Sequence, residues 1–431
     1  MPTLTFMASG TIDISPVAAR LTMSMRDVGY DFVSAIADVV DNSIEAGARH
    51  VAIDLEYRER DSYVRIADDG HGMSPTAINE ALRFGSDSSY GENSLGKYGL
   101  GLKTASLSQC RTLVVLSRAA RQRRRIYGRV LDLDHIGRTN TWTALSIKHD
   151  VFMPSIVGDL DRAPGTVVLW MNLDRVFDGL KGFGGHARRR FERLAESVSA
   201  HLGMVFHRFI DGEVPESDAV KITVNGEIVQ SWDPFARSEE LTVVLQPKRF
   251  VVVPGRAPVT FTPYLLPHRE GFSTPKAFER AGGPNRWNRQ QGLYIYRANR
   301  LIQAGGWAGL RAIDEHTKLA RAAIDFQTDL DDLFQVNVAK MRVSLPAPLK
   351  TPLERAVGEL ISAAQARYRR GEVVARDSND RSRDESPADL SEIGVAIRAA
   401  AISAGESDAQ LRIEAKLRKL APEVAAAVGW A

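Results

Sequence analysis

The first helix is predicted over residues 31–48, where apolar side chains return every three or four positions. Ile36, Val39 and Val40 would share one face of it, and Gly47 follows as a natural stop. Alternating or continuous apolar runs predict strands in four segments: 50–57, 62–70, 111–119 and 165–173. Helical spacing predicts two more helices, over 102–110 and 186–207.

Beyond residue 207 the apolar runs are shorter and are separated by turn residues. Asn225-Gly226 lies between two alternating runs, a pattern typical of a β-hairpin over 219–232. Further strands are predicted at 249–254, 259–267 and 292–303. A helix is expected over 348–370, a charged and mobile linker over 375–389, and short amphipathic helices beyond residue 390.

Length and these patterns divide the chain into three consecutive parts, 1–180, 181–348 and 349–431. The composition, 44% hydrophobic and 25% charged, is ordinary for a folded protein. No apolar run is long enough for a membrane-spanning helix, so we expect no membrane association through one. The single cysteine, Cys110, excludes an internal disulfide framework and favours a reducing compartment. Because the first residues also lack a secretory signal, we expect a cytoplasmic protein.

Arginines gather in two short stretches, although the formal net charge is only +3. The first stretch spans residues 118–129 and the second 188–193. Clusters of this kind can neutralise the phosphates of nucleic acid. A solvated hairpin and a solvated helix face would account for them equally well. The sequence therefore leaves double-stranded DNA as one candidate partner.

A carboxylate and a carboxamide, Asp38 and Asn42, are spaced four residues apart in the first predicted helix. This spacing places both side chains on one face, a single turn apart. An amide oxygen is a hard ligand suited to Mg²⁺. A carboxylate beside such an ion can polarise water as a general base. Pairs with this spacing are common on solvated helix surfaces, so the pair alone is weak evidence.

A second pattern, VRIADDGHGM (64–73), is a strand that ends in Asp68 and Asp69 and opens into two glycines. Glycines allow a flat ligand to approach the backbone closely. A carboxylate at the end of a strand can accept a hydrogen bond from an exocyclic amine such as that of adenine. An ordinary Asp-Gly turn explains the same residues when this segment is considered in isolation.

A third pattern, SLGKYGLGLKTAS (94–106), places three glycines and Lys103 ahead of a helix. Backbone N–H groups at such a helix start can bind phosphate, and the lysine adds positive charge. A Rossmann site is excluded because the glycines do not follow a first strand with an acidic residue beyond it. A P-loop is excluded because the chain contains no G-x-x-x-x-G-K-[ST] segment.

In this order and spacing, the segments resemble the motifs of the GHKL superfamily, which includes gyrase-type topoisomerases, heat-shock chaperones, histidine kinases and MutL. The three segments are DNSIEAGA (41–48), DDGHGM (68–73) and GKYGLGLK (96–103). APGT (163–166), which precedes an apolar strand, is similar to the fourth motif of the family. The resemblance implies a Bergerat-fold α/β sandwich that binds ATP with Mg²⁺, within an α+β protein.

The resemblance also implies the role of each matched residue. Asn42 would ligate Mg²⁺, Asp68 would read the adenine amine, and Thr166 would lie beneath Asp68. A mobile lid would extend over residues 74–102 and close over ATP. The other residues implied around the nucleotide are Gly70, Gly72, Met73, Gly96, Lys97, Tyr98, Gly99, Leu100, Gly101, Leu102 and Lys103.

Asp38 departs from the family pattern, because hydrolysing members carry Glu at this position. Asp is one methylene shorter, which moves the carboxylate roughly 1–1.5 Å away from the water. A misplacement of this size can lower the rate about a hundredfold. We therefore expect Asp38 to act as a slow general base, with ATP binding and lid closure as the main switch.

The second part of the chain resembles the MORC and MutL branches of the superfamily. GLYIYRANRLIQAGGW (292–307) is similar to a segment of the MORC ATPases. FQVNVAKMRVSLP (334–346) is similar to the stretch of MutL and topoisomerases in which a lysine reaches the γ-phosphate from a ribosomal-protein-like transducer domain. By position this catalytic lysine is Lys340, and an exposed strand lysine is the alternative. Arg300 is expected to support its strand rather than to touch ATP.

Three functional hypotheses follow from these features. The first is an ATPase that dimerises on binding ATP, with residues 1–25 as a candidate strap, and clamps double-stranded DNA in repair, compaction or defence. The second is a chaperone-like or assembly ATPase that clamps a partner protein recruited by the C-terminal tail. The third is a nucleotide sensor that binds ATP without hydrolysing it.

Overall fold

The computed structural model describes residues 16–430, apart from a set of gaps. The gaps are residues 28, 85–100, 122–124, 180–181, 216, 285, 338–339, 341–342 and 381–390. The chain forms two compact units, each built from non-consecutive stretches. The first comprises Met1–Asp233, Ile295–Gln303 and Asp325–Ser344, and the second comprises Pro234–Tyr294, Ala304–Ile324 and Leu345–Ala431. The division into 1–180, 181–348 and 349–431 stays a prediction.

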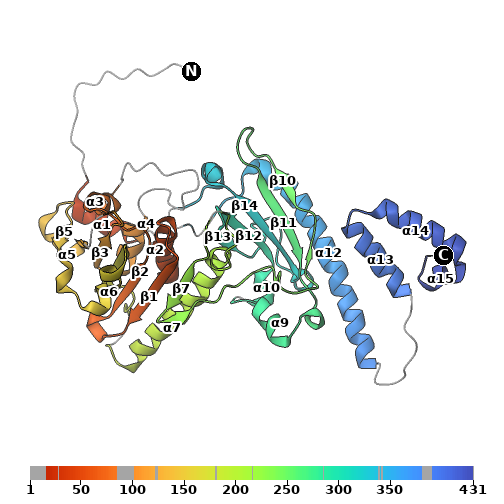
Figure 1. Ribbon diagram of the computed structural model, residues 1–431, viewed down its shortest axis with the longest axis horizontal. Coiled ribbons are helices and arrows are strands. Elements are labelled where there is room, and N and C mark those ends of the chain that lie inside the picture. Colours follow the sequence, from red (N-terminus) through yellow and green to blue (C-terminus); the bar gives the residue numbers. More distant parts are fainter. Residues whose placement is uncertain are drawn as a thin grey trace, which may run out of the picture. The chain divides into compact units, whose positions relative to one another are not determined.

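An eight-stranded sheet is the scaffold of the first unit (Figure 1). Its strands run in the order β5-β4-β3-β6-β2-β1-β7-β8, and of its neighbouring pairs only β1 and β7 are parallel. The strands are β1 His50–Glu56, β2 Tyr63–Asp68, β3 Thr112–Arg118, β4 Tyr127–Asp132, β5 Leu145–Ile147, β6 Gly165–Met171, β7 Lys221–Val224 and β8 Glu227–Ile228.

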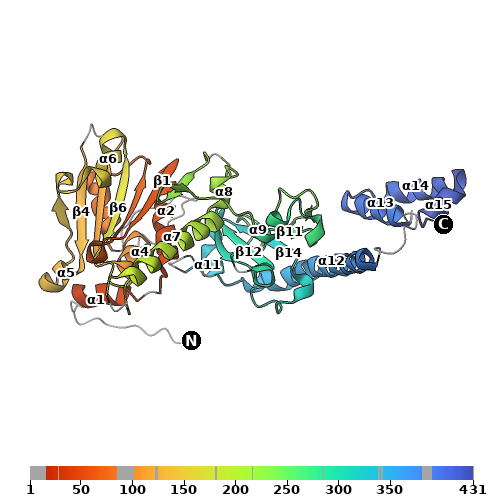
Figure 2. The ribbon, with the colours of Figure 1, turned by 90° about the horizontal axis from the view of Figure 1, so that it is seen from below.

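Helices cover both faces of this sheet (Figure 2), so its central strands β2, β3 and β6 are buried on two sides. Along β3, alternate side chains point to opposite faces of the sheet, and each face contacts its own apolar cluster. Leu113 and Val115 belong to the apolar cluster that includes helices α2, α4 and α7, whereas Val114 and Leu116 belong to the cluster under α6. These helices are α2 Phe32–Glu45, α4 Gly101–Gln109, α6 Pro154–Arg162 and α7 Gly185–Val205.

Shorter elements complete the first unit. The helices are α1 Ala18–Met25, α3 Pro75–Leu82, α5 Leu133–Thr139, α8 His207–Ile210 and α11 Asp331–Phe334, and the 3-10 turns are η1 Glu59–Asp61, η2 His149–Val151 and η5 Thr328–Leu330. The α2 helix begins at Asp31, whose side chain accepts a hydrogen bond from the Ser34 N–H and so caps the first turn.

A six-stranded sheet has the order β10-β11-β14-β12-β13, with β9 paired to β11. The strands are β9 Val243–Val244, β10 Lys248–Phe250, β11 Val259–Leu265, β12 Gly292–Arg297, β13 Arg300–Ala304 and β14 Ala320–Phe326. The boundary between the two units passes through β12, β13 and β14. The remaining elements are η3 Arg269–Gly271, α9 Pro275–Ala281, α10 Arg286–Gln290, η4 Glu315–Thr317, α12 Ala347–Asp380, α13 Ser391–Ser403, α14 Ser407–Leu420 and α15 Pro422–Ala427.

The α+β class predicted from the sequence is confirmed, as are the first helix and the hairpin at Asn225-Gly226. Three predicted elements differ in extent. The strand expected at 292–303 is divided into β12 and β13, because the backbone turns at Ala298 and Asn299, whose φ angles are +46° and +69°. The strand expected at 249–254 ends at Phe250, because the backbone turns before Gly255, whose φ is +84°. The linker expected at 375–389 begins later, because α12 continues to Asp380, and residues 381–390 lie outside the described part.

None of the helices in the described part of the chain combines the length and apolar character that crossing a membrane requires.

Candidate active site

Asp68, at the end of β2, is held by three hydrogen-bond donors from three segments. Its Oδ1 accepts the N–H groups of Gly70 at 3.0 Å and Thr166 at 3.2 Å, and its Oδ2 accepts the Ser43 hydroxyl at 3.0 Å. Burial raises the pKa of Asp68 above its ordinary value, and the Gly70 N–H opposes that shift. The carboxylate therefore has a fixed orientation before any ligand binds.

Thr166 reaches Asp68 because β2 and β6 are neighbours, with the two residues directly opposite each other. Ser117, on β3, forms hydrogen bonds that connect the turn after β2 to the start of β6. Its hydroxyl accepts the Met73 N–H at 2.8 Å, donates to the Gly165 carbonyl at 2.8 Å and lies 3.0 Å from the Thr166 hydroxyl. These bonds fix the DDGHGM turn against the strand that carries Thr166.

Two glycines in this turn are required by close backbone packing. A Cβ at Gly70 would lie 2.8 Å from the Cβ of Ala46, at the end of α2. Gly72 has a φ of +65°, and a Cβ there would lie 2.0 Å from the carbonyl oxygen of Arg118. The turn therefore lies directly against the ends of the central strands β3 and β6, and the glycines permit this close approach.

Asn42 lies on the exposed side of α2, one turn after Asp38. Its Nδ2 donates to the Asp38 carbonyl oxygen at 2.9 Å, which leaves Oδ1 as the amide atom able to ligate a hard cation. This donor chemistry fits the Mg²⁺ role that the sequence implies. Among the described residues, no group of three or more His, Cys, Asp and Glu could hold a metal without help from a substrate.

Asp38 belongs to a buried cluster of four charged side chains in the first unit. Lys340 Nζ lies 2.7 Å from Asp41 Oδ2 and 3.3 Å from Asp38 Oδ1. Arg300 donates from Nε to Asp41 Oδ1 at 2.7 Å, and its Nη2 lies 3.6 Å from Asp38 Oδ1. Each of the four side chains is at most 8% exposed, so two carboxylates and two cations balance in a largely buried volume.

Asp38 also has a neutral hydrogen-bond donor beside it. The Tyr30 hydroxyl donates to Asp38 Oδ2 over 2.6 Å. Burial, and then the neighbouring Asp38 carboxylate, raise the pKa of Tyr30 above its ordinary value, so the phenol keeps its proton. Burial also raises the pKa of Asp38, and the Lys340 ammonium group opposes that shift.

Lys103 is buried in α4, and its Nζ donates to the carbonyl oxygens of Ala81 at 3.0 Å and Arg83 at 2.7 Å. These carbonyls lie at the end of α3, where a cation is favoured by the helix dipole. Burial lowers the pKa of Lys103 to about 8. The implied contact between Lys103 and phosphate stays a prediction.

Several predicted site residues are not part of the described structure. Gly96, Lys97, Tyr98, Gly99 and Leu100 fall in the segment 85–100, which lies outside the described residues. Of the predicted lid over 74–102, Pro75–Leu82 forms α3, and Gly101 and Leu102 begin α4. The roles assigned to all these residues stay predictions.

Sequence reasoning missed four residues that the structure brings to the site: Tyr30, Asp41, Ser43 and Ser117. One signal was present for Asp41. Asp41 lies in a helix that is rich in apolar residues, and a carboxylate that such a helix buries needs a neutralising partner. The sequence offers no comparable signal for the two serines or the tyrosine.

Part of the first unit is similar to a known protein family. A family described as "Histidine kinase-, DNA gyrase B-, and HSP90-like ATPase" matches residues 30–157. The matched range contains Asp38, Asn42 and Asp68 but ends before Thr166 and Lys340.

Individual relatives extend the similarity beyond that range. The chain is 26% identical to ATPase morc-1 of Caenorhabditis elegans over 245 residues, which are 52% of this chain and 26% of the relative. It is 27% identical to DNA mismatch repair protein MutL of Haemophilus influenzae (strain PittEE) over 230 residues, 52% of this chain and 31% of the relative. Similarity to Protein MICRORCHIDIA 6 of Arabidopsis thaliana is 33% over 89 residues, 20% of this chain and 13% of the relative. The chain therefore spans less than a third of the length of each of these relatives.

Proposed function

We propose that this chain binds ATP with Mg²⁺ and hydrolyses it slowly, because residues 30–157 match the family of histidine kinase-, DNA gyrase B- and HSP90-like ATPases. The observation that carries the proposal is the position of Lys340. Its Nζ lies 3.3 Å from Asp38, although 302 residues separate the two in sequence. A cation and a candidate general base in one buried cluster are the groups that phosphoryl transfer to water requires.

Asp68 supports adenine as the base of the nucleotide. Its carboxylate is fixed by Gly70, Thr166 and Ser43, and it retains lone pairs to accept the exocyclic amine of adenine. Guanine presents a carbonyl oxygen at the same position, and two acceptors facing each other repel. The site should therefore prefer ATP to GTP.

At the other end of the site, Asp38 would accept a proton from the attacking water. Lys340 would stabilise the negative charge that develops on the γ-phosphate. Mg²⁺ bound through Asn42 Oδ1 would supply further neutralisation of phosphate charge. Because the Asp38 side chain is short and is already engaged by Tyr30 and Lys340, turnover is expected to be slow.

The decisive experiment separates binding from hydrolysis. Asp68→Asn should weaken ATP binding at least about tenfold, because it loses a charged acceptor for the adenine amine. Asp38→Asn should keep ATP binding and lose phosphate release. Asp69→Asn is the matched control, because Asp69 accepts backbone N–H groups of Arg49 and His50 on the exposed side of the same turn. If Asp68→Asn binds ATP as the unaltered chain does, the proposed site is wrong.

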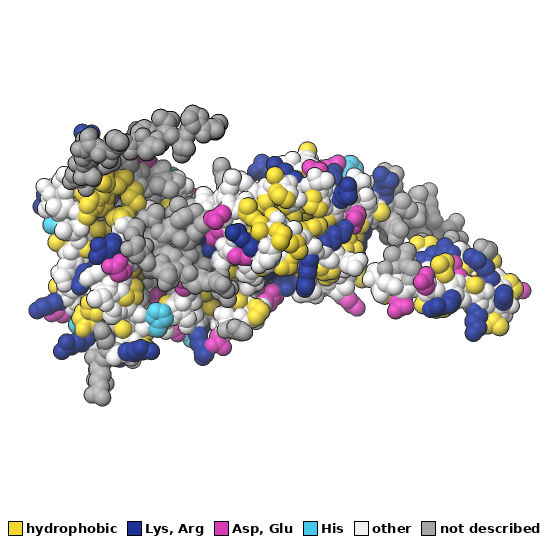
Figure 3. Space-filling view, turned by 90° about the horizontal axis from the view of Figure 1, so that it is seen from above, with side chains coloured by type: hydrophobic (Ala, Val, Ile, Leu, Met, Phe, Trp, Pro, Cys, Tyr) yellow, Lys and Arg dark blue, Asp and Glu magenta, His cyan; other side chains and the backbone are white. Residues whose placement is uncertain are grey.

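The proposal includes dimerisation on ATP binding and action on double-stranded DNA. Supporting it are the relatives named MORC and MutL and the exposed arginines Arg188, Arg189 and Arg193 on α7. On the face shown in Figure 3, lysine and arginine side chains are scattered among acidic and apolar ones. From the first arginine stretch, Arg118 is bound to the carbonyls of Leu160 and Asp161, so it is less available to phosphate.

DNA action is tested by titrating duplex DNA against the chain at increasing salt, with and without a non-hydrolysable ATP analogue. Binding through phosphates should weaken steeply with salt, and replacing Arg189 and Arg193 by Glu should weaken it further. Mass measurement under the same conditions tests the dimer. Absence of binding at low salt in both nucleotide states would rule out the DNA proposal.

A protein partner is the second candidate, favoured by the helices α13 to α15. Ile397, Leu411 and Ile413 are 44%, 59% and 58% exposed there, which is unusual for large apolar side chains. A chaperone-like or assembly ATPase would use such a surface to recruit its partner. Deleting residues 381–431 should then abolish partner capture while ATP binding survives. A chain that binds ATP but releases no more phosphate than Asp38→Asn would instead be a nucleotide sensor.

A further inference from the structure

The two oxygens of the Asp38 carboxylate have different surroundings. Oδ2 accepts the Tyr30 hydroxyl at 2.6 Å, whereas Oδ1 faces Lys340 at 3.3 Å and Arg300 at 3.6 Å. When Lys340 turns to a phosphate, Oδ1 is the oxygen that becomes available to water. Oδ2 stays engaged, because the phenol has no comparable reason to move.

Helix α4 lies against Asp38 Oδ2 from another side. A Cβ placed on Gly101, the first residue of α4, would lie 3.3 Å from Asp38 Oδ2. The glycine therefore allows the helix start to lie against the carboxylate. Together with the phenol, this contact prevents Oδ2 from reaching a water molecule and restricts the carboxylate to one orientation.

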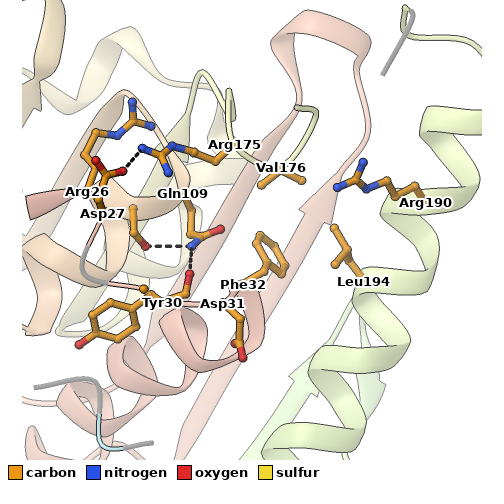
Figure 4. Close-up of a pocket in the computed structure, with 12 residues that line it drawn as sticks. Arg26, Asp27, Tyr30, Asp31, Phe32, Gln109, Arg175, Val176, Arg190 and Leu194 are labelled. Carbon is orange, nitrogen blue, oxygen red and sulfur yellow. Dashed lines mark hydrogen bonds and ion pairs between the residues drawn. The ribbon is translucent and has the colours of Figure 1, made fainter. Parts of the chain in front are cut away.

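Tyr30 is itself held by α4 at two points. Its hydroxyl forms a hydrogen bond with the Thr104 side chain, and its carbonyl oxygen accepts Gln109 Nε2 at 3.2 Å. In Figure 4 the ring of Tyr30 points away from a pocket of about 380 Å³ that its backbone lines together with Phe32 and Gln109. Tyr30 as a whole is only 8% exposed. Tyr30 thus connects the carboxylate on α2 to the helix that directly follows the predicted lid.

We propose that Tyr30 is a positioning residue for hydrolysis, which anchors Asp38 Oδ2 so that Oδ1 is presented to the attacking water. The inference rests on the proposed ATP hydrolysis and deepens it. It also gives a reason for the short carboxylate, since the phenol occupies space that the extra methylene of a glutamate would need. Tyr30 and Asp38 together would take the place of the single glutamate that the family resemblance leads us to expect at position 38.

The test is a double-mutant cycle in the full-length chain, with ATP as the probe for both binding and turnover. Tyr30→Phe removes only the hydroxyl, and it should lower kcat about tenfold or more while ATP affinity changes less than about twofold. Tyr63→Phe is the matched control, since Tyr63 is equally buried at 8% exposure but lies on the opposite face of the sheet. It should leave kcat unchanged.

The second arm of the cycle distinguishes positioning from a structural role. Asp38→Glu should raise kcat little when Tyr30 is present, because the phenol and Gly101 restrict the longer side chain. In the Tyr30→Phe background the same change should raise kcat at least about tenfold, since space is then available. A merely structural tyrosine would not make the effect of Asp38→Glu depend on its hydroxyl.

Three results would overturn the proposal. One is a wild-type kcat in Tyr30→Phe. Another is an equal effect of Asp38→Glu in both backgrounds. The third is a loss of ATP affinity in Tyr30→Phe as large as the loss of kcat. Each of these leaves the proposed ATPase function intact as long as the unaltered chain hydrolyses ATP. If that chain binds ATP and releases no phosphate, both proposals fail together.

Discussion

Lys340 is bound more closely to Asp41 than to the candidate base, with its Nζ 2.7 Å from Asp41 Oδ2. Arg300 shares the same carboxylate through Oδ1 at 2.7 Å. Asp41 therefore neutralises two cations that arrive from distant parts of the sequence. In the free chain this pairing keeps Lys340 beside the site, in a buried cluster that a nucleotide phosphate would have to compete for.

Asp41→Asn should destabilise the folded chain by about 3–5 kcal/mol, because two buried cations would then share Asp38 alone. Unfolding in urea, followed by circular dichroism, measures the change. Glu192→Gln is the control, since Glu192 forms an exposed pair with Arg188 that is worth less than about 1 kcal/mol. Equal stabilities for the two variants would show that the buried cluster does not hold the fold together.

Lys340→Met should lower kcat for ATP by about a hundredfold or more, because the variant lacks the cation proposed to stabilise charge in the transition state. ATP affinity should fall much less, since the proposed contact between Asp68 and adenine does not involve Lys340. Phosphate release and equilibrium binding measure the two effects. Lys221→Met, an exposed lysine on β7, serves as the comparison and should behave as the unaltered chain. Unchanged turnover in Lys340→Met would remove Lys340 from the site.

The stability of the chain should rise between about pH 8 and the ordinary lysine pKa of about 10.4, owing to Lys103. Folding lowers the pKa of this lysine to about 8, so the charged form is penalised in the folded chain. The penalty is present below that pH and disappears as the pH rises, because the unfolded chain then binds more protons than the folded chain. The slope is at most about 1.4 kcal/mol per pH unit. Lys103→Met should remove this part of the pH dependence in unfolding experiments, and a slope that persists would contradict it.

Ser117→Ala should weaken ATP binding and lower stability by about 1–3 kcal/mol, because it leaves the Met73 N–H without its acceptor at the base of the turn. Ser197→Ala, on the exposed side of α7, removes a single hydrogen bond to the Arg193 carbonyl and should change neither quantity. Calorimetric titration with ATP checks the first effect and thermal unfolding the second.

The sequence predicts the part of the site that is local or carried by family motifs. Asp38 and Asn42 could be placed on one helix from their spacing, and the opposition of Asp68 and Thr166 follows from the resemblance. Asp41 could not be assigned, because its partners lie 259 and 299 residues further along the chain. Periodicity carries no information about contacts at such separations.

Tyr30 and Ser117 were missed for a different reason. Hydroxyl groups are common and neutral, so neither spacing nor charge indicates which of them will meet a carboxylate or a backbone N–H. The extent of β10 and α12 was misjudged because apolar valines continue past Phe250, whereas charged residues occur inside the end of α12. Backbone torsion and helix length decided these boundaries, and composition alone does not specify either.

The long separation within the charged cluster has a consequence for synthesis on the ribosome. Asp38 and Asp41 are made early, and residues 30–84 and 101–173 supply most of the strands around them. Their cations Arg300 and Lys340 are made only some 260 to 300 residues later. Closing a loop of this length costs entropy, although this cost grows only slowly with the number of residues in the loop. A nascent chain that stops before residue 295 therefore carries two carboxylates without counterions. The fold around the site is complete only when translation has passed Lys340, so truncated products are expected to be unstable and accessible to proteases.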